Sequence, residues 1–454
     1  MQSPHSSLEK VRRLSPPDRE QAMGSSIRGS VRRRRILMLL ENESYPDDTR
    51  VGLEARSLQG AGYEVTVICP TGDRRTKHEV IDGVRIYRYP RPWAIGGFVG
   101  YFLEYAYSMA VAFVVSLFVL LRHGFDAVHV HAPPDMNALI ARCYQLLGKR
   151  FVLDLHDLSP ELYQAQRNGR GNRTVHRALL WFERFACRSA DRLIATNESQ
   201  RNVQIHRAGV DPGRCYVVRN GPGAKFLLPV SGLEEFRDSG RTIIGYVGMI
   251  GVQDGLDCLM RTLADLRYRL GREDFLAVIV GSGPAWESVR RLSKELKLED
   301  CVRFTGYVSG HPLLQHIASF DICVTPDPSN PYNDSCTTVK TMEYMAMGKP
   351  TVAFDLPENR CTAGEAALYA SGNNEAELAL RIRELMDDPE RREAIGHIAR
   401  DRVQRHFMWE MQAPRLLELY QGLLTNDGVN VRDEPIEKRI VGDRFARTAS
   451  TSAT

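Results

Sequence analysis

The sequence of 454 residues predicts an α/β fold built from two doubly wound parallel sheets. Three observations lead to this prediction. Short continuous apolar runs, typical of strands buried in a parallel sheet, alternate with segments of helical periodicity. The alternation breaks between 223 and 240 and restarts at 242. The chain is also too long for one hydrophobic core, so two domains are expected.

The first half opens with a strand–helix–strand unit. Residues 36–41 (ILMLLE) are one apolar run, and residues 64–70 (EVTVICP) are the next. Between them, Asp48 belongs to a group of N-cap formers that precedes apolar residues at helical spacing. This order predicts a βαβ unit. Further strands are expected at 84–90, 127–134, 150–156, 191–197 and 216–222.

An apolar stretch at 101–121 stands out between these strands. A membrane-spanning helix needs about 20 apolar residues, and Glu104 and Ser108 interrupt the upstream part. We expect a partly exposed helix that lies in one leaflet, and a buried core helix is the alternative. The basic run Arg32–Arg35 is either a solvated flank or a second contact with an anionic membrane surface.

Histidines mark the ends of two predicted strands. His129 and His131 are two residues apart and so face the same side of one strand, but the sequence shows no third metal ligand at a suitable spacing. His156 and Asp157 end the next strand, in the crevice where open parallel sheets bind ligands. His156 is the candidate for the catalytic centre, and a structural role at the strand end is the alternative.

The second half repeats the alternation. Strands are expected at 242–248, 274–284, 302–308, 321–328 and 350–355, and helices follow to about 424. The loop after the first of these strands carries Gly248 and Gly251, and glycines let a phosphate approach the backbone amides.

The most informative stretch is 330–350, NPYNDSCTTVKTMEYMAMGKP. Loop residues lead into a helical pattern that ends at Gly348-Lys349-Pro350. Lys340 in its first turns offers an anion site with the helix N-terminus, and Glu343 offers a carboxylate to sugar hydroxyls. An amphipathic helix with a solvent-exposed lysine would give the same periodicity.

This stretch resembles the donor-site helix of the retaining glycosyltransferases of family 4, which have the GT-B fold of two Rossmann-like domains. The resemblance covers about 34–424 and includes GYVG, FTGYV and the HD pair. It implies that Glu343 binds the nucleotide ribose and that Lys340 stands near the diphosphate. Many members carry a second glutamate eight residues before the first, where this chain has Ser335.

The resemblance also implies roles for residues elsewhere. Most relatives carry an arginine and a lysine in the glycine loop, where this chain has Met249 or Ile250, and Gln253, so Lys340 and the helix N-terminus are left to balance the phosphate charge. The implied catalytic residues are His156, Lys340 and Glu343. The implied donor-binding residues are Gly248, Gly251, Gly306, Tyr307, Val308, Ser335, Thr338, Lys340 and Glu343. Arg50, Glu54 and Asp157 are implied on the acceptor side, although ordinary helix surface charges would explain the first two equally well.

We therefore expect a disordered basic tail at 1–33, an acceptor-side domain at 34–222, a linker at 223–240 and a nucleotide-sugar domain at 241–405. A helix at 406–424 would cross back to the first domain, and 425–454 would be disordered. The function implied is transfer of a hexosyl or N-acetylhexosaminyl unit from a nucleotide-diphosphate sugar to a lipid-linked or polysaccharide acceptor at the inner membrane face. No metal or other cofactor is expected. A sugar-nucleotide epimerase and a non-catalytic sugar-nucleotide-binding protein are the alternatives.

Composition narrows the possible functions and the cellular location of the protein. The net charge of +4 is small for this length, so nucleic-acid binding is not indicated. The nine cysteines form no C-x-x-C pair, which argues against a zinc site or a disulfide framework and favours reduced thiols in the cytoplasm. The N-terminus lacks the apolar region of a signal peptide. We expect a cytoplasmic protein, peripheral on the inner membrane face.

Overall fold

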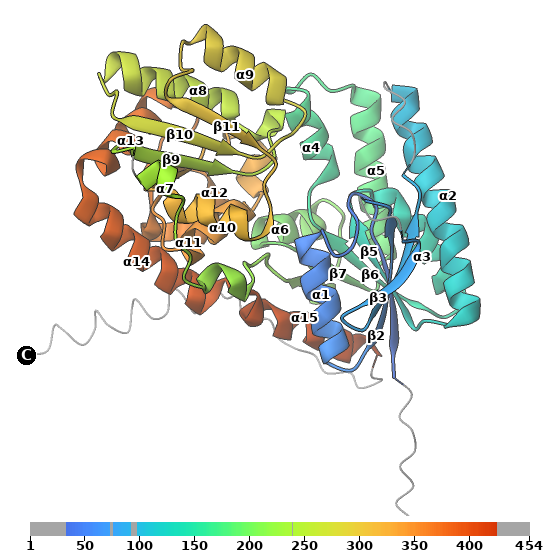
Figure 1. Cartoon of the computed structure of the whole chain (residues 1–454). Helices are drawn as coiled ribbons and strands as arrows, with labels where there is room; N and C mark the ends of the chain where they lie inside the picture. The colour runs from blue at the N-terminus through green and yellow to red at the C-terminus, as the bar shows by residue number, and fades with distance from the viewer. Residues whose placement is uncertain (1–32, 73–75, 92–97, 238, 425–454) are drawn as a thin grey trace, which may run out of the picture. The chain divides into compact units, whose positions relative to one another are not determined.

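The computed structural model describes residues 33–72, 76–91, 98–237 and 239–424 (Figure 1). The predicted tail at 1–33, apart from Arg33, and the predicted tail at 425–454 lie outside the described residues. The chain forms two largely parallel sheets with helices on both faces, so the predicted α/β class is confirmed.

The first sheet has eight strands in the order β3-β4-β2-β1-β5-β6-β7-β8. All neighbours are parallel except β3 and β4, which pair antiparallel. The sequence analysis missed β3, whose four residues alternate between exposed and half-buried at the sheet edge. The strands are β1 Arg35–Leu39, β2 Glu64–Pro70, β3 His78–Ile81, β4 Val84–Tyr89, β5 Ala127–Ala132, β6 Arg150–Leu155, β7 Arg192–Ala195 and β8 Cys215–Val217.

Helices on the two faces of this sheet begin where the sequence supplies a cap. The Asp48 carboxylate accepts a hydrogen bond from the Val51 amide at 2.9 Å and so starts the first helix as predicted. The last helix of the chain, α15, packs on α1 and on the first sheet through apolar residues such as Leu416 and Tyr420. These helices are α1 Thr49–Gly60, α2 Phe98–Arg122, α3 Ala138–Gln145, α4 Ser159–Gln166, α5 Arg173–Ser189, α6 Glu198–His206 and α15 Trp409–Leu424.

The second sheet has six parallel strands in the order β11-β10-β9-β12-β13-β14. Its strands are β9 Thr242–Val247, β10 Phe275–Val280, β11 Val302–Gly306, β12 Ile322–Thr325, β13 Thr351–Phe354 and β14 Ala367–Ala370. Its helices are α8 Leu256–Ala264, α9 Trp286–Glu295, α10 Gly310–Ser319, α11 Val339–Ala346, α12 Pro357–Ala363, α13 Glu375–Asp387 and α14 Pro389–His406. The short helix α7 Glu234–Arg237 precedes this sheet.

Two loops at the carboxyl edge of the second sheet touch through glycine. Gly281 follows β10 with φ of +143°, and a Cβ atom there would lie 1.8 Å from the carbonyl oxygen of Gly248. The Gly248 amide in turn donates to the carbonyl of Val280 at 3.0 Å. Only glycine permits this approach, which fixes the loop after β9 against the loop after β10.

Helix α2 carries apolar or small side chains on both of its faces. Ser108, Ala112, Ser116 and Val119 face the protein and are at most 4% exposed. The opposite face exposes Leu103, Tyr107, Val114, Leu117, Phe118 and Leu121. The predicted partial exposure of this helix is therefore confirmed, whereas its contact with a membrane stays a prediction.

Among the helices in the described ranges, α2 alone has a segment with the length and hydropathy of a membrane span. That segment is Leu103–Arg122, with a mean hydropathy of 1.9 and 22% of its most apolar window buried in the protein. The small share of buried residues distinguishes it from the core helix of a soluble domain, which passes the same test when most of it is buried.

Candidate active site

The predicted site residues lie where strands of the two sheets end. His156 and Asp157 directly follow β6, Gly248 and Gly251 follow β9, and Gly306 ends β11. Ser335 and Thr338 lie in the segment that leads into α11. Ligands of open α/β sheets bind outside the carboxyl ends of the strands, so these positions suit a binding site.

Direct hydrogen bonds bring the HD pair and the 330–338 segment together. The Tyr332 hydroxyl donates to Asp157 Oδ1 at 2.8 Å. The Asn197 side-chain amide, at the start of α6, donates to the carbonyl oxygen of Ser335 and to Thr337 Oγ1, both at 2.9 Å. The Ser335 hydroxyl is bonded within its own turn, to the carbonyl of Tyr332 at 2.9 Å. Asp157, predicted on the acceptor side, is therefore held by the donor-side segment.

Helix α11 is anchored to β9 through its buried face. The Val247 amide donates to the Tyr344 hydroxyl at 2.7 Å, and Met342 and Met345 are fully buried beside it. Thr338 precedes the first residue of α11, and its hydroxyl lies 2.9 Å from the hydroxyl of Thr341. The anchoring leaves Lys340 and Glu343 on the less buried side of the helix.

Lys340 is already paired with two carboxylates, which the sequence analysis did not anticipate. Its Nζ lies 3.1 Å from Asp327 Oδ1 and 3.7 Å from Asp254 Oδ1. It also donates to the Tyr246 hydroxyl at 3.2 Å and lies 4.7 Å from the centroid of that ring. Although burial acts to lower the pKa of Lys340, the charge of Asp327 raises it well above its usual value.

Asp254 occupies part of the loop that was expected to hold the diphosphate. Its Oδ2 accepts from the Gly251 amide at 2.9 Å. Burial raises the pKa of Asp254 to about 6, against the attraction of Lys340. A ligand phosphate at this loop would compete with a carboxylate that already accepts from one backbone amide and pairs with the lysine.

Glu343 differs from Lys340 in having no hydrogen-bond or ion-pair partner among the described residues. Burial raises the pKa of Glu343 to about 7, and the charge of Lys225 opposes the rise. No protein donor among the described residues competes with a ligand for this carboxylate. This is the property expected of a residue that accepts hydrogen bonds from ribose hydroxyls.

The remaining donor-side positions differ in exposure. Gly306 adopts φ of +81°, so a larger side chain would strain the turn that ends β11. Tyr307 is 77% exposed, whereas Val308 packs on the apolar cluster around α11 and β9.

His156 is held by a carboxylate that the sequence analysis missed. Its Nε2 lies 3.1 Å from Asp154 Oδ2, and its side chain is 21% exposed. Burial acts to lower the pKa of His156, but the Asp154 charge raises it above the usual value. Asp154 stands two residues earlier in LDLHD, a charged residue inside an apolar strand, and this alternation was the available signal.

Arg50 and Glu54 require a correction. They were expected at the edge of the site or on a helix surface, but their side chains are 7% and 0% exposed. Arg50 makes a two-pronged ion pair with Asp154, Nε to Oδ2 and Nη2 to Oδ1, both at 2.9 Å. Arg50 is therefore buried as the partner of the Asp154 carboxylate, and Glu54 lies beside this ion pair.

Comparisons with known proteins agree with this architecture. Residues 48–221 match the model of the glycosyl transferase 4-like domain, and 241–388 match that of the glycosyl transferases group 1. The D-inositol 3-phosphate glycosyltransferase of Kineococcus radiotolerans is 27% identical over 81% of this chain and 88% of its own length. Sucrose-phosphate synthase from Thermosynechococcus elongatus superposes with a TM-score of 0.71 at 19% identity, over 86% of this chain and 99% of that one. HepE of Anabaena, solved with UDP-glucose, gives a TM-score of 0.63 at 15% identity, over 85% and 99%.

Proposed function

The chain belongs to the family-4 glycosyltransferases of the GT-B fold, and from this premise we propose that it transfers a sugar, with retention of configuration, from a nucleotide-diphosphate sugar. The observation that carries the donor site is Glu343, a half-buried carboxylate of α11 with no side-chain partner among the described residues. The segment that leads into α11 contacts the HD pair through Tyr332 and Asp157. Solved neighbours of the fold bind UDP and UDP-glucose, which supports a donor of this chemical class.

In this reaction the bond between the anomeric carbon and the diphosphate oxygen breaks. The acceptor oxygen bonds to the same face of that carbon, and its proton passes to the leaving phosphate. Glu343 would fix the ribose, and the N–H groups of α11 and the Lys340 ammonium would stabilise the departing charge. His156 would donate a hydrogen bond that orients the donor and the acceptor.

A donor panel tests this proposal. Sugar nucleotides of several bases and sugars are added singly, and the melting temperature of the full chain is measured. A ligand at 100 times its Kd stabilises the folded state by about 2.7 kcal/mol, which is readily detected. Stabilisation by one class of sugar nucleotide is expected. Absence of any shift across the panel would contradict the proposal, and turnover of the donor without an acceptor would indicate an epimerase instead.

Replacement of Lys340 is expected to destabilise the fold as well as donor binding. Lys340→Met leaves the carboxylates of Asp254 and Asp327 facing each other without their cation. Removing one partner of a buried ion pair costs about 3–5 kcal/mol, so the free energy of unfolding in urea should fall by that amount. The double variant Lys340→Met/Asp327→Asn should recover part of the loss. A loss below about 1 kcal/mol would show that the pair is solvated.

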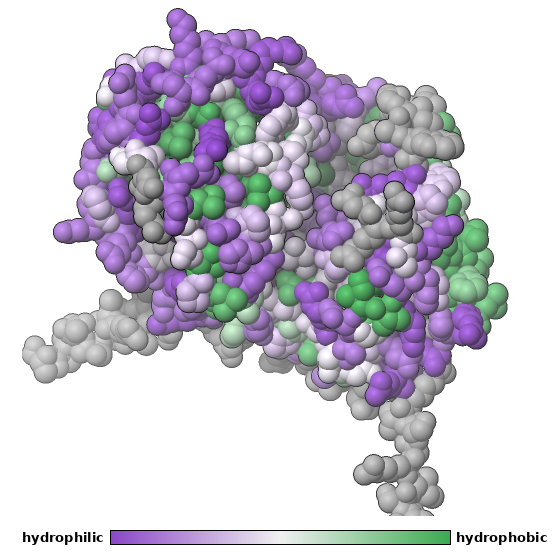
Figure 2. All heavy atoms as spheres, in the orientation of Figure 1, coloured by the Kyte–Doolittle hydropathy of each residue, from purple (hydrophilic) through white to green (hydrophobic). Residues whose placement is uncertain are grey.

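We further propose that the acceptor is lipid-linked and that the protein reaches it at an anionic membrane surface. The exposed face of α2 supports this, because Val114, Phe118 and Leu121 are 64%, 54% and 87% exposed. Figure 2 shows hydrophobic atoms gathered along the outer edge of this helix. Leu146 and Leu147, which follow α3, are also exposed, and the basic residue Arg122 ends α2. Apolar residues rimmed by positive charge suit anionic lipid.

Vesicle flotation checks this part of the proposal. The full chain should float with vesicles of anionic phospholipid and remain in the soluble fraction with neutral ones. Phe118→Glu/Leu121→Glu should lower the bound fraction at least about tenfold, because burying each side chain is worth about 1.5–3 kcal/mol. Ile398→Glu, at an exposed apolar position on α14, is the matched control and should float normally. A wild-type protein that never floats would contradict membrane binding without affecting the donor assignment.

A further inference from the structure

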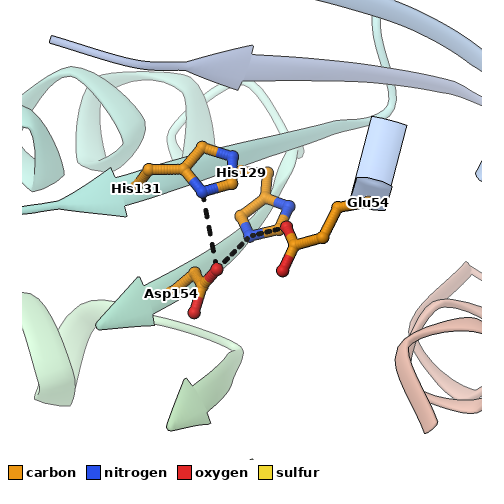
Figure 3. Close-up of side chains that lie close together, drawn as sticks. All are labelled: Glu54, His129, His131 and Asp154. Atoms are coloured by element: carbon orange, nitrogen blue, oxygen red, sulfur yellow. Dashed lines mark ion pairs between the residues drawn. The ribbon is translucent and has the colours of Figure 1, made fainter. Parts of the chain in front are cut away.

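A group of buried polar side chains lies directly behind His156. Figure 3 shows Glu54 of α1, His129 and His131 of β5, and Asp154 of β6 pointing toward one another. All four are at most 1% exposed. Both oxygens of Glu54 and the Nε2 atoms of both histidines have no hydrogen-bond partner within the described part of the chain. Such a group is costly to bury and therefore calls for a function.

These four side chains place potential ligand atoms within 4.8 Å of one another, which is close enough for a metal ion. Arg50, however, already binds both oxygens of Asp154, and its Nη2 lies 3.2 Å from Glu54 Oε1. Its Nη1 donates to the carbonyl of Val218 at 3.0 Å and to Asn220 Oδ1 at 2.8 Å. The guanidinium is thus a fixed positive charge in the group, and it opposes a second cation there.

We propose that Asp154 is a positioning residue that, together with His131, fixes the tautomer and the orientation of the His156 ring. The inference rests on the proposed role of His156 in sugar transfer.

The hydrogen-bond geometry determines which ring nitrogen meets the substrate. A carboxylate oxygen only accepts, so the His156 Nε2 atom, 3.1 Å from Asp154 Oδ2, carries a proton. The Nδ1 atom of His131 lies 3.1 Å from the same nitrogen, and the two rings meet edge to face at 5.2 Å. The Nδ1 atom of His156 has no partner among the described residues. It is the nitrogen left for the substrate.

The charges of the buried side chains decide whether the Nδ1 atom of His156 carries a proton. The carboxyl groups of Glu54 and Asp154 both lie against the guanidinium of Arg50. Burial and the charge of Asp154 raise the pKa of Glu54 well above its usual value, although the charge of Arg50 opposes the rise. Burial acts to raise the pKa of Asp154, but Arg50 holds it well below its usual value, so Asp154 carries the negative charge.

Other titratable groups also face His156: burial raises the pKa of the neighbouring Asp157, and the charge of His156 opposes the rise. Burial lowers the pKa of His131 and of His129, whose Nδ1 also contacts the Tyr420 hydroxyl of α15 at 2.9 Å. Asp48 at the start of α1 adds a weaker attraction, and Arg50 a weaker repulsion. The Asp154 charge therefore favours the imidazolium of His156, which offers Nδ1–H as a donor. Above its pKa the same nitrogen becomes an acceptor, and activity that depends on the donor should fall.

The test combines histidine NMR with kinetics on the full-length enzyme. The ring signals of His156 are assigned by their loss in His156→Gln, and their titration is followed in the wild type and in Asp154→Asn. Removal of the carboxylate should lower the pKa of His156 and move the alkaline limb of the kcat profile to lower pH. We expect kcat to fall about 10- to 100-fold, as for other orienting partners, while the KM for the donor changes less than about twofold.

A second pair of variants keeps the inference testable if Asp154→Asn fails to fold, since that change leaves Arg50 short of a partner. His131→Asn keeps a polar group at the place of Nδ1, whereas His131→Leu has similar size and no polar atom. The asparagine variant should retain at least about tenfold more kcat than the leucine variant. Equal losses in the two variants, an unchanged pKa of His156 in Asp154→Asn, or a stoichiometric divalent metal in the purified protein would overturn the inference. A lowered pKa with an unchanged pH profile would support the positioning and instead contradict the role of His156 in transfer.

Discussion

Glu343→Gln is expected to weaken donor binding about 10- to 150-fold, which corresponds to the 1.5–3 kcal/mol of a hydrogen bond to a charged group. The glutamine keeps the size of the side chain but loses the charge that accepts from ribose hydroxyls. Because the Glu343 side chain has no partner among the residues that the structure describes, its replacement removes no bond seen there, and the free energy of unfolding should not fall. Isothermal titration with the donor chosen from the panel measures the effect.

The pH dependence of donor binding gives the same assignment a second measurement. The pKa of Glu343 is raised to about 7 by burial, so the free carboxyl is largely protonated below that pH. Ribose binding favours the ionised form, and the Kd should therefore fall as pH rises through about 7 and level off above it. Glu343→Gln should flatten this dependence. Glu410→Gln, at an exposed position in the first turn of α15, is the control that should leave both affinity and profile intact. A titration of the same shape in Glu343→Gln would assign the pH effect to another group.

His156→Ala is expected to lower kcat about 10²–10³-fold, the loss typical of one preorganised donor in an active site. The donor should still bind, because the ribose and diphosphate contacts proposed above are made by α11 and the loop after β9, not by His156. The melting-temperature shift with donor is therefore expected to persist while transfer is lost. Kinetics with the donor and a membrane extract as acceptor source measure the change.

The conservative variant His156→Gln separates orientation from charge in that experiment. Its amide can donate one hydrogen bond but cannot carry the positive charge that Asp154 favours on the imidazole. We expect partial recovery of kcat relative to alanine and no alkaline limb attributable to residue 156. A His156→Ala enzyme with wild-type turnover would leave the histidine with a structural role only.

The sequence was sufficient to predict elements whose signal is local. Continuous apolar runs such as 36–41 and 242–248 mark the central strands, because both faces of those strands are covered by helices. Strands β3 and β14 were missed, since a strand of only four residues at a sheet edge is too short to carry a clear pattern. Asp48 identified the start of α1 because an N-cap acts within one turn.

The partners of the site residues could not be predicted, because they come from distant parts of the chain. Lys340 meets Asp254 and Asp327 only after β9, β12 and α11 have packed together. Arg50 meets Asp154 across 104 positions of sequence. Periodicity places a charged residue on a helix, but it does not reveal whether that charge faces water or an opposite charge. The expectation of an unpaired lysine therefore failed, and so did the expectation that Arg50 lies at an edge.

If α2 binds a bilayer as proposed, its two faces would fix the orientation of the protein on that bilayer. Toward the middle of the helix, Ser108 lies beside Glu41, which follows the carboxyl end of β1, and at the helix end Arg35 at the amino end of β1 donates to the His123 carbonyl. The helix axis thus follows the direction of the strands, and the helix of 25 residues is roughly 37 Å long. With its outer face on lipid, its axis would lie parallel to the membrane plane, and the reacting groups would face sideways along the leaflet instead of down into it. An acceptor head group would then need a spacer long enough to rise beside the protein, which makes spacer length a determinant of turnover.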